Sequence, residues 1–418
     1  MPPKSSCTIF NIVSLSTVFI TLSLLFKLFI FRSDPSASIR VASNPEGQPR
    51  DLTLRFQKDG TFRIAVFEDL HFGEGCLVFY DMVYLVLTFV TAEDTTWGPT
   101  QDANSTRVLN TILSTENPQL VVLNGDLITG EDTYLENSTT YLDQIVATLI
   151  KYDILWASTY GNHDSDFNLS RTDLFNEEQR FPGSLTQSVN LPPDAGITNY
   201  YLPVYPSNGS MAAPALMLWF FDSRGGNEFQ QTDASGGKIG IPSVVDNSVI
   251  SWFRETSVRI AVNYNRIIPS LAFFHIPTSS MLTFQDGGVD PAKEPGINDD
   301  VPLDAQKNDS SFESALLETP GLIATFSGHD HGNDWCFKWS GESTERRHTK
   351  RGLFHCFGRH TGYGGYGSWV RGSRQILLRE KTLSEEVVTW VRLEDTSISG
   401  NVVLNATYGE DEYPVVSR

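Results

Sequence analysis

The chain has 418 residues, of which 40% are hydrophobic and 19% are charged. This length and composition predict one large or two medium folded domains and exclude an intrinsically disordered chain. The 31 Lys and Arg residues against 50 Asp and Glu residues give a net charge of −19. Such a surface repels a phosphate backbone on average, which argues against nucleic acid as a natural partner. A bound phosphate would need a local positive charge, and metal ions are the obvious source.

The N-terminal residues 1–33 are predicted to form a signal anchor or a signal peptide. Thr8–Phe26 is an uncharged, largely apolar stretch of 19 residues, long enough to span a bilayer or to form the core of a cleaved signal. Basic residues on its C-terminal side oppose the orientation of a signal anchor. Both alternatives therefore stay open, and membrane association through this segment is one of them. Residues 34–50, rich in Ser, Pro, Asn and Gly, are expected to form a stalk or linker.

Sequons for N-glycosylation are frequent after this leader. Six Asn-x-Ser/Thr sequences occur, at Asn104, Asn137, Asn168, Asn208, Asn308 and Asn405. Beside a hydrophobic leader they favour a glycoprotein of the secretory pathway, either secreted or anchored by a single span.

From residue 51 to 418 the sequence alternates strand-like and helical segments, with no convincing second domain boundary. Apolar runs predict strands at Arg63–Glu68, Gln119–Asn124, Ile154–Tyr160, Ala215–Phe221, Ser270–Phe274 and Leu322–Ser327. Helices are predicted at Ser105–Ser114, capped by Asn104 or Ser105, at Thr140–Lys151 and at Ser248–Asn263. Further strands are expected between Val387 and Asn405. The alternation indicates an α/β architecture in which helices cover strands.

Polar side chains follow five of these strands at their carboxyl ends, the edge where open α/β sheets bind ligands. The five motifs are Asp69-Leu70-His71, Gly125-Asp126, Gly161-Asn162-His163-Asp164, His275, and Gly328-His329-Asp330-His331. Carboxylates and imidazoles suit a pair of divalent cations that clamp the attacking and leaving oxygens of a phosphoryl transfer. In Asp-x-His the two ligands share one side of a strand end. The glycines before Asp126 and Asn162 are expected to let the backbone turn sharply.

In this order the motifs resemble the calcineurin-like metallophosphoesterase superfamily, in a branch related to purple acid phosphatases, over roughly residues 60–370. The resemblance implies a four-layer sandwich of two mixed β-sheets flanked by helices. By this resemblance Asp69, His71 and His331 hold the first metal, Asp126 bridges, and Asn162, His275 and His329 hold the second. His163 would act as the general acid or transition-state donor, with Asp164 orienting its ring.

Two departures from the purple enzymes stand out. Where they carry a tyrosine ligand three residues after the bridging aspartate, this chain has Thr129. We therefore expect a non-purple site with two divalent ions, Mn²⁺, Fe²⁺ or Zn²⁺. The second departure is an apolar insertion, Cys76–Ala92, beside the first motif. We interpret it as a gene-model error, an intron translated in frame; the alternative is a real buried or membrane-facing insertion.

The function predicted from these features is hydrolysis of phosphomonoesters, of small molecules or phosphoproteins, by a water held between two metals. The alternatives are a phosphodiesterase of the same superfamily and a catalytically impaired, membrane-tethered glycoprotein. Two smaller features stay open: the glycine-dense segment Gly358–Gly367, whose Arg359 or His360 could contact phosphate or which could be a structural turn, and a Cys336–Cys356 disulfide. The sequence leaves the oligomeric state unknown.

Overall fold

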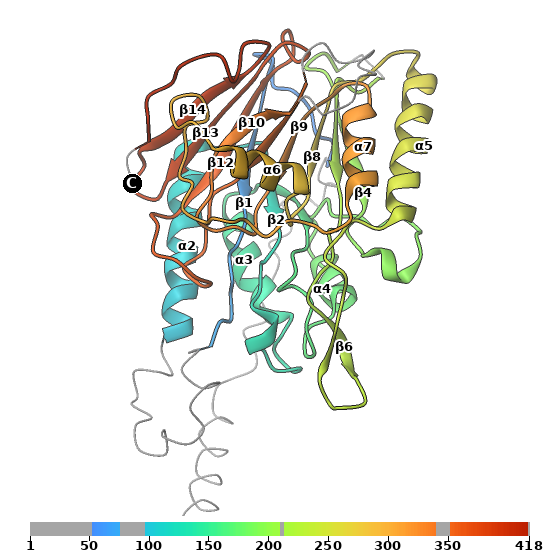
Figure 1. Cartoon of the computed structure of the whole chain (residues 1–418), viewed down its shortest axis with the longest axis vertical. Coiled ribbons are helices and arrows are strands. Elements are labelled where there is room, and N and C mark those ends of the chain that lie inside the picture. The colour runs from blue at the N-terminus through green and yellow to red at the C-terminus, as the bar shows by residue number, and fades with distance from the viewer. Residues whose placement is uncertain (1–51, 76–96, 210–212, 340–351, 417–418) are drawn as a thin grey trace, which may run out of the picture. The chain divides into compact units, whose positions relative to one another are not determined.

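Two six-stranded mixed sheets, packed face to face, form the centre of the protein (Figure 1). The computed structural model describes residues 52–75, 97–209, 213–339 and 352–416. The predicted leader, the linker and the Cys76–Ala92 insertion lie outside these residues. Within the described parts of the chain, no helix is both long and apolar enough to cross a membrane.

The first sheet carries three of the five motifs. Its strands lie in the order β14 (Ile398–Leu404), β13 (Val387–Leu393), β12 (Gly372–Arg379), β1 (Thr61–Phe67), β2 (Leu120–Asn124) and β3 (Leu155–Thr159). β1, β2 and β3 are parallel, whereas β12, β13 and β14 add antiparallel pairs. The motifs after β1, β2 and β3 therefore meet at one edge of this sheet.

The second sheet carries the other two motifs. Its strands lie in the order β10 (Cys336–Trp339), β11 (Leu353–Phe357), β9 (Leu322–Ser327), β8 (Ser270–Phe273), β5 (Leu216–Phe220) and β4 (Tyr200–Val204). The pairs β5–β8, β8–β9 and β9–β11 are parallel. The pairs β10–β11 and β4–β5 are antiparallel.

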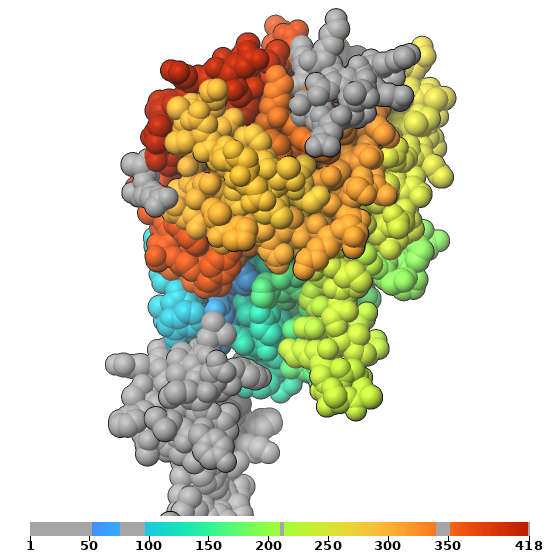
Figure 2. Space-filling model, in the orientation of Figure 1, coloured from blue at the N-terminus to red at the C-terminus, as the bar shows by residue number. Residues whose placement is uncertain are grey.

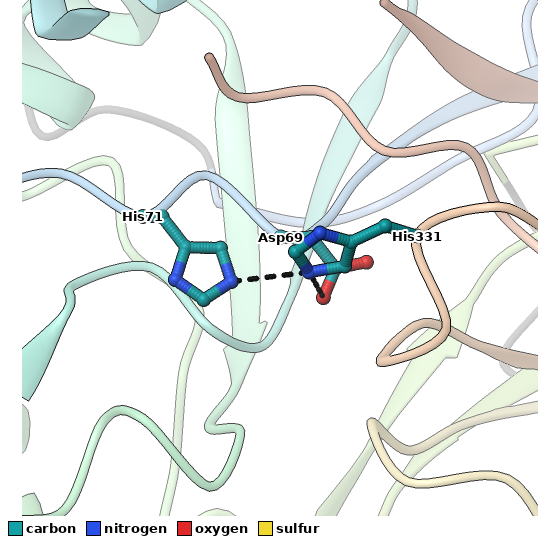
Figure 3. Close-up of side chains that lie close together, drawn as sticks. All are labelled: Asp69, His71 and His331. Carbon is teal, nitrogen blue, oxygen red and sulfur yellow. Dashed lines mark hydrogen bonds and ion pairs between the residues drawn. The ribbon is translucent and has the colours of Figure 1, made fainter. Parts of the chain in front are cut away.

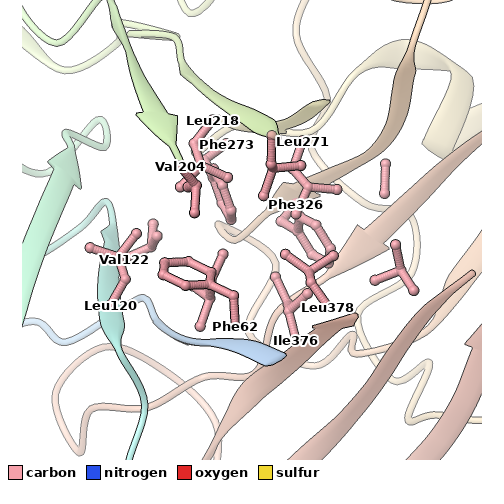
Figure 4. Packing of buried hydrophobic residues seen from close by; sticks show 14 of the residues in the cluster. Phe62, Leu120, Val122, Val204, Leu218, Leu271, Phe273, Phe326, Ile376 and Leu378 are labelled. Atoms are coloured by element: carbon pink, nitrogen blue, oxygen red, sulfur yellow. The ribbon is translucent and has the colours of Figure 1, made fainter. Parts of the chain in front are cut away.

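Three apolar clusters hold the layers together. Between the sheets, side chains such as Phe62, Val122, Phe273 and Phe326 interdigitate (Figure 4). Because successive side chains of a strand point to opposite faces, Ala65 and Phe67 of β1 pack instead with the helix side of the first sheet. Helices α2 (Trp97–Glu116) and α3 (Thr140–Lys151) cover this side, and α5 (Asn247–Tyr264) and α7 (Ser310–Glu318) cover the second sheet. The predicted four-layer α/β sandwich is confirmed.

Shorter elements connect the layers. They are α4 (Arg171–Glu178), α6 (Ser279–Gly287) and a hairpin of β6 (Asn227–Thr232) and β7 (Lys238–Gly240). The hairpin, yellow-green in Figure 2, projects from the body of the domain. The six predicted strands and three predicted helices are all present, within a few residues of the predicted bounds for all but one helix. The exception is α2, where the predicted cap is wrong: Asn104 and Ser105 lie inside the helix, and Ser105 Oγ donates to the Gln101 carbonyl at 2.9 Å.

The disulfide that the sequence left open is present. Cys336 and Cys356 occupy directly paired positions of β10 and β11, with 4.0 Å between their Cα atoms. It joins neighbouring strands of the second sheet.

Candidate metal centre

The turns after the five strands are held in conformations that bring their polar side chains together. Asp69, His71, Asp126 and His329 all have positive φ angles, between 49° and 78°. Gly125 has a φ of 94°, as expected for a glycine that turns the backbone. Gly161 serves differently: a Cβ atom there would lie 2.2 Å from Asp126 Oδ1, so the glycine permits close packing of two motifs.

Six of the seven predicted ligands gather in two groups of three. Within each group, the ligand atoms lie within 4.8 Å of one another. We call Asp69, His71 and His331 the covered group (Figure 3). We call Asp126, His275 and His329 the open group. In the covered group the two imidazole Nε2 atoms of His71 and His331 are 3.2 Å apart, and His331 Nε2 lies 3.6 Å from Asp69 Oδ1.

Asp126 lies between the groups. Its Oδ2 atom is 2.9 Å from His275 Nε2 and 3.9 Å from His71 Nε2. Asn162, the seventh predicted ligand, has a buried Oδ1 atom without a hydrogen-bond partner. Buried polar atoms are rarely left in this state, so this oxygen is suited to ligating an ion.

The outer nitrogens of three predicted ligand imidazoles already have partners. Nδ1 of His275 contacts the Asn124 carbonyl at 2.9 Å, and Nδ1 of His331 contacts the Tyr366 carbonyl at 3.0 Å. His71 Nδ1 lies 3.1 Å from Oγ of Thr129, the residue that replaces the tyrosine of the purple enzymes. Such partners set the tautomer and leave Nε2 for a metal.

The electrostatics of the centre also fit cations. Burial and the neighbouring Glu68 and Asp126 carboxylates raise the pKa of Asp69 well above its usual range. Burial lowers the pKa of His71 well below its usual range. Crowded carboxylates beside neutral imidazoles are the donors that divalent ions require, because binding needs ionised Asp and neutral His. The Asp, Asn and His donor set, without thiolates, matches Mn²⁺, Fe²⁺ or Zn²⁺.

The glycine-dense segment covers one side of the centre. The Tyr366 ring stacks on His331 at 4.0 Å between centroids, and its hydroxyl donates to Asp300. Gly365 lies against both imidazoles of the covered group: a Cβ there would be 2.5 Å from His331 Cε1 and 2.9 Å from His71 Cδ2. The segment therefore packs on two predicted ligands, His331 and His71. The sequence alone left its role open.

The suggested phosphate contacts of this segment are wrong. The Arg359 guanidinium is buried and pairs with Asp334 at 2.7 Å and with the Val370 carbonyl. The His360 ring is buried, with Nε2 directed to the Gly364 carbonyl at 3.0 Å. Both side chains hold the segment in place and neither is available to a substrate.

A cleft of about 400 Å³ reaches part of the centre. Asn162 and His329 line it together with Ser243, Asp304 and Lys307. His329 is 16% exposed, against 3% or less for each member of the covered group. Through this cleft His329 and Asn162 are the predicted ligands accessible from outside.

His163 lies beside both groups, and the carboxylate that contacts its ring differs from the expected one. Its backbone amide donates to Asp126 Oδ1 at 2.8 Å, and its ring centroid is 5.0 Å from that of His71. Asp164 does not orient this ring: its carboxylate accepts the backbone amides of Leu127, Ile128 and Gly161. The carboxylate that pairs with the ring is Glu131, with 2.6 Å between Oε1 and Nδ1.

Charge around His163 is strongly negative. Burial lowers its pKa, but Asp126 and Glu131 outweigh burial and raise the pKa to about 10. Sequence reasoning missed Glu131, which lies five residues after Asp126 in a stretch without a recognisable motif.

The fold and the two groups of candidate metal ligands indicate a class, the metal-dependent phosphoesterases. The calcineurin-like phosphoesterase family model matches residues 62–333, and the chain belongs to that family. Similar curated proteins are probable inactive purple acid phosphatase 28 of Arabidopsis thaliana, 30% identical over 383 residues, and phosphatase DCR2 of Saccharomyces cerevisiae, 28% identical over 355 residues. The first match covers 84% of each chain; the second covers 81% of this chain and 55% of the yeast protein.

Among solved structures, the chain is similar to a dimetal phosphatase from Danio rerio, at 15% identity and a TM-score of 0.49. The alignment covers 82% of this chain and 99% of that chain.

Proposed function

We propose that this protein is a binuclear metal-dependent phosphoesterase that hydrolyses phosphomonoesters. The observation that carries the proposal is the place of Asp126, whose Oδ2 atom lies within 3.9 Å of ligand nitrogens from both groups. Such a carboxylate can bridge two ions. Asp69, His71 and His331 would then hold one ion, and Asn162, His275 and His329 the other.

The chain's own groups supply binding, orientation and a proton. Two bound divalent cations would supply Lewis acidity for the phosphoryl group and for water. The cleft admits the ester beside Asn162 and His329. As the oxygen of water bonds to phosphorus, the bond from phosphorus to the ester oxygen breaks. His163 gives a proton to that leaving oxygen, a contribution of about 10²–10⁴-fold in rate.

We also propose that the protein is a glycoprotein that enters the secretory pathway, secreted or membrane-anchored. The Cys336–Cys356 disulfide supports an oxidising compartment. The sequon residues Asn208 and Asn308 are exposed, as a glycan requires.

A specific observation favours a second candidate, a protein that binds metal without turnover. The Arabidopsis relatives carry the description "probable inactive" in their names. Against it stands the full set of seven predicted ligands and His163 in this chain, with Asn162 and His329 lining a cleft. A degenerate site would have lost some of these donors.

The test is Mn²⁺-supported hydrolysis of 4-nitrophenyl phosphate by the full-length protein and by its Asp126→Asn variant. We expect activity that EDTA abolishes and that the variant lacks, with metal content falling in the variant. Bis(4-nitrophenyl) phosphate tests the diesterase alternative, which faster diester hydrolysis would establish. Wild-type protein that binds two ions but hydrolyses neither ester would support the second candidate.

A further inference from the structure

His163 has a carboxylate partner that none of the five motifs contains. The Glu131 Oε1 atom lies 2.6 Å from His163 Nδ1, and the two side chains are 33% and 35% exposed. The neighbouring Asp164, the partner expected from sequence, is completely buried. Its two carboxylate oxygens accept hydrogen bonds from three backbone amides. Glu131 is therefore the acid available to this imidazole.

The chain holds Glu131 on a short 3₁₀-helix, Gly130–Asp132, that is tied to its surroundings at both ends. At one end the Gly130 amide donates to the His163 carbonyl at 3.0 Å, and a Cβ on residue 130 would lie 2.5 Å from that oxygen. At the other end Asp132 Oδ2 accepts the Gly75 amide at 2.8 Å. The element that carries Glu131 is thus docked against the backbone of the residue whose ring Glu131 contacts.

This arrangement decides which ring nitrogen faces the centre. A carboxylate on Nδ1 fixes both the rotation of an imidazole and the nitrogen left for another partner. Here it leaves Nε2 for a bound ester. We propose that Glu131 is the positioning residue for His163; this inference rests on the proposed function, in which His163 donates to the leaving oxygen.

The proposal makes a prediction about leaving groups. A nitrophenolate leaves readily without a proton, whereas an alkoxide needs one as the bond to phosphorus breaks. Misplacing His163 should therefore slow hydrolysis of an alkyl phosphate much more than hydrolysis of 4-nitrophenyl phosphate. Partners that orient a functional imidazole are worth about 10- to 100-fold.

The experiment compares Glu131→Ala, Glu131→Gln, His163→Ala and the double variant of Glu131→Ala with His163→Ala on glycerol 2-phosphate and 4-nitrophenyl phosphate. Glu131→Ala should lower kcat on the alkyl ester by about 10- to 100-fold and on the aryl ester far less, with metal content unchanged. Glu131→Gln, which keeps an acceptor oxygen, should recover part of the loss. The double variant should be no slower than His163→Ala, because the two residues act as one unit. Glu136→Gln, an exposed charge change on the same loop, is the matched control.

Equal losses on both esters, or losses that multiply in the double variant, would overturn the proposal. A second readout does not need turnover. In ¹H–¹⁵N spectra, a hydrogen-bonded Nδ1 proton assigned by its absence in His163→Ala should disappear in Glu131→Ala. Its persistence would show that Glu131 is not the partner. Wild-type protein with this signal but without hydrolysis would contradict the proposed function and leave the pairing standing.

Discussion

The covered and open groups of the metal centre are built from the same kinds of side chain but differ in what lies over them. The covered group sits under the glycine-dense segment, with Tyr366 stacked on His331. In the open group His329 lines the cleft, whereas Asp126 and His275 are as buried as the covered group. The difference separates two environments: one group is packed under a loop, and the other includes a side chain at a cleft.

The largest effect is expected where that loop touches the covered group. Gly365 has a φ of 70°, and a Cβ there would meet His331 and His71 within 2.9 Å. Gly365→Val should displace these imidazoles, release one bound ion and lower activity by about 10- to 100-fold. Metal analysis after gel filtration measures the ion content.

The matched control for this variant is Gly236→Ala. Gly236 has a similar φ of 85°, but a Cβ there meets nothing within 4 Å. It carries the backbone strain, about 1 kcal/mol, without the collision. If both variants keep two ions, the covering segment does not set the geometry of the covered group.

A smaller effect is expected when the cleft beside Asn162 and His329 is narrowed. Ser243 is exposed and lines the cleft with Asn162 and His329. Ser243→Trp should raise KM for esters of bulky alcohols by about 10-fold while metal content and kcat stay nearly unchanged. Ser251→Trp, on the exposed side of α5, serves as the control for the added indole. An unchanged KM would place the substrate elsewhere.

The disulfide lies in the second sheet and belongs to neither group of predicted ligands. Cys336→Ser together with Cys356→Ser should lower the free energy of unfolding by roughly 3 kcal/mol, because the bridge closes a loop across 20 residues. Urea titration measures the loss. Activity at 25 °C should be retained, and its disappearance under folded conditions would show that β10 and β11 support the centre directly.

The smallest effect is expected from deleting residues 76–92, the suspected translated intron. The described residues on either side lie close together: a Cβ on Gly98 would be 2.1 Å from the Glu74 carbonyl oxygen. Gly75 and Gly73 are separately fixed by Asp132 and Asp102. The deletion should keep both ions and equal or greater activity. Transcript sequencing decides the origin of the segment, and loss of metal on deletion would make it a working part of the protein.

Much of the centre was predictable because its ligands follow buried strands directly. The apolar runs that end at Asp69, Asp126 and His329 specify parallel strands, and parallel strands deliver their carboxyl ends to one edge. The glycine before Asp126 likewise has a local conformational reason. These signals need only neighbouring residues, so the sequence is sufficient to reveal them.

The parts that were missed depend on contacts between distant residues. Arg359 resembled a phosphate ligand, but its charge is neutralised by Asp334, 25 residues earlier. Glu131 occupies a short turn whose position comes from the backbone of His163. The start of α2 was misplaced because the polar residues near Asn104 look like a cap, although packing keeps them helical.

The Asp164 carboxylate links two turns that follow different strands of the first sheet. Its oxygens accept amides from the turn after β2, at Leu127 and Ile128, and from the turn after β3, at Gly161. Without this carboxylate these three amides would lose their partner. An unpaired buried amide costs about 1–3 kcal/mol. Grafting loops from a relative, or shuffling segments in directed evolution, must therefore move both turns and this aspartate as one inherited block.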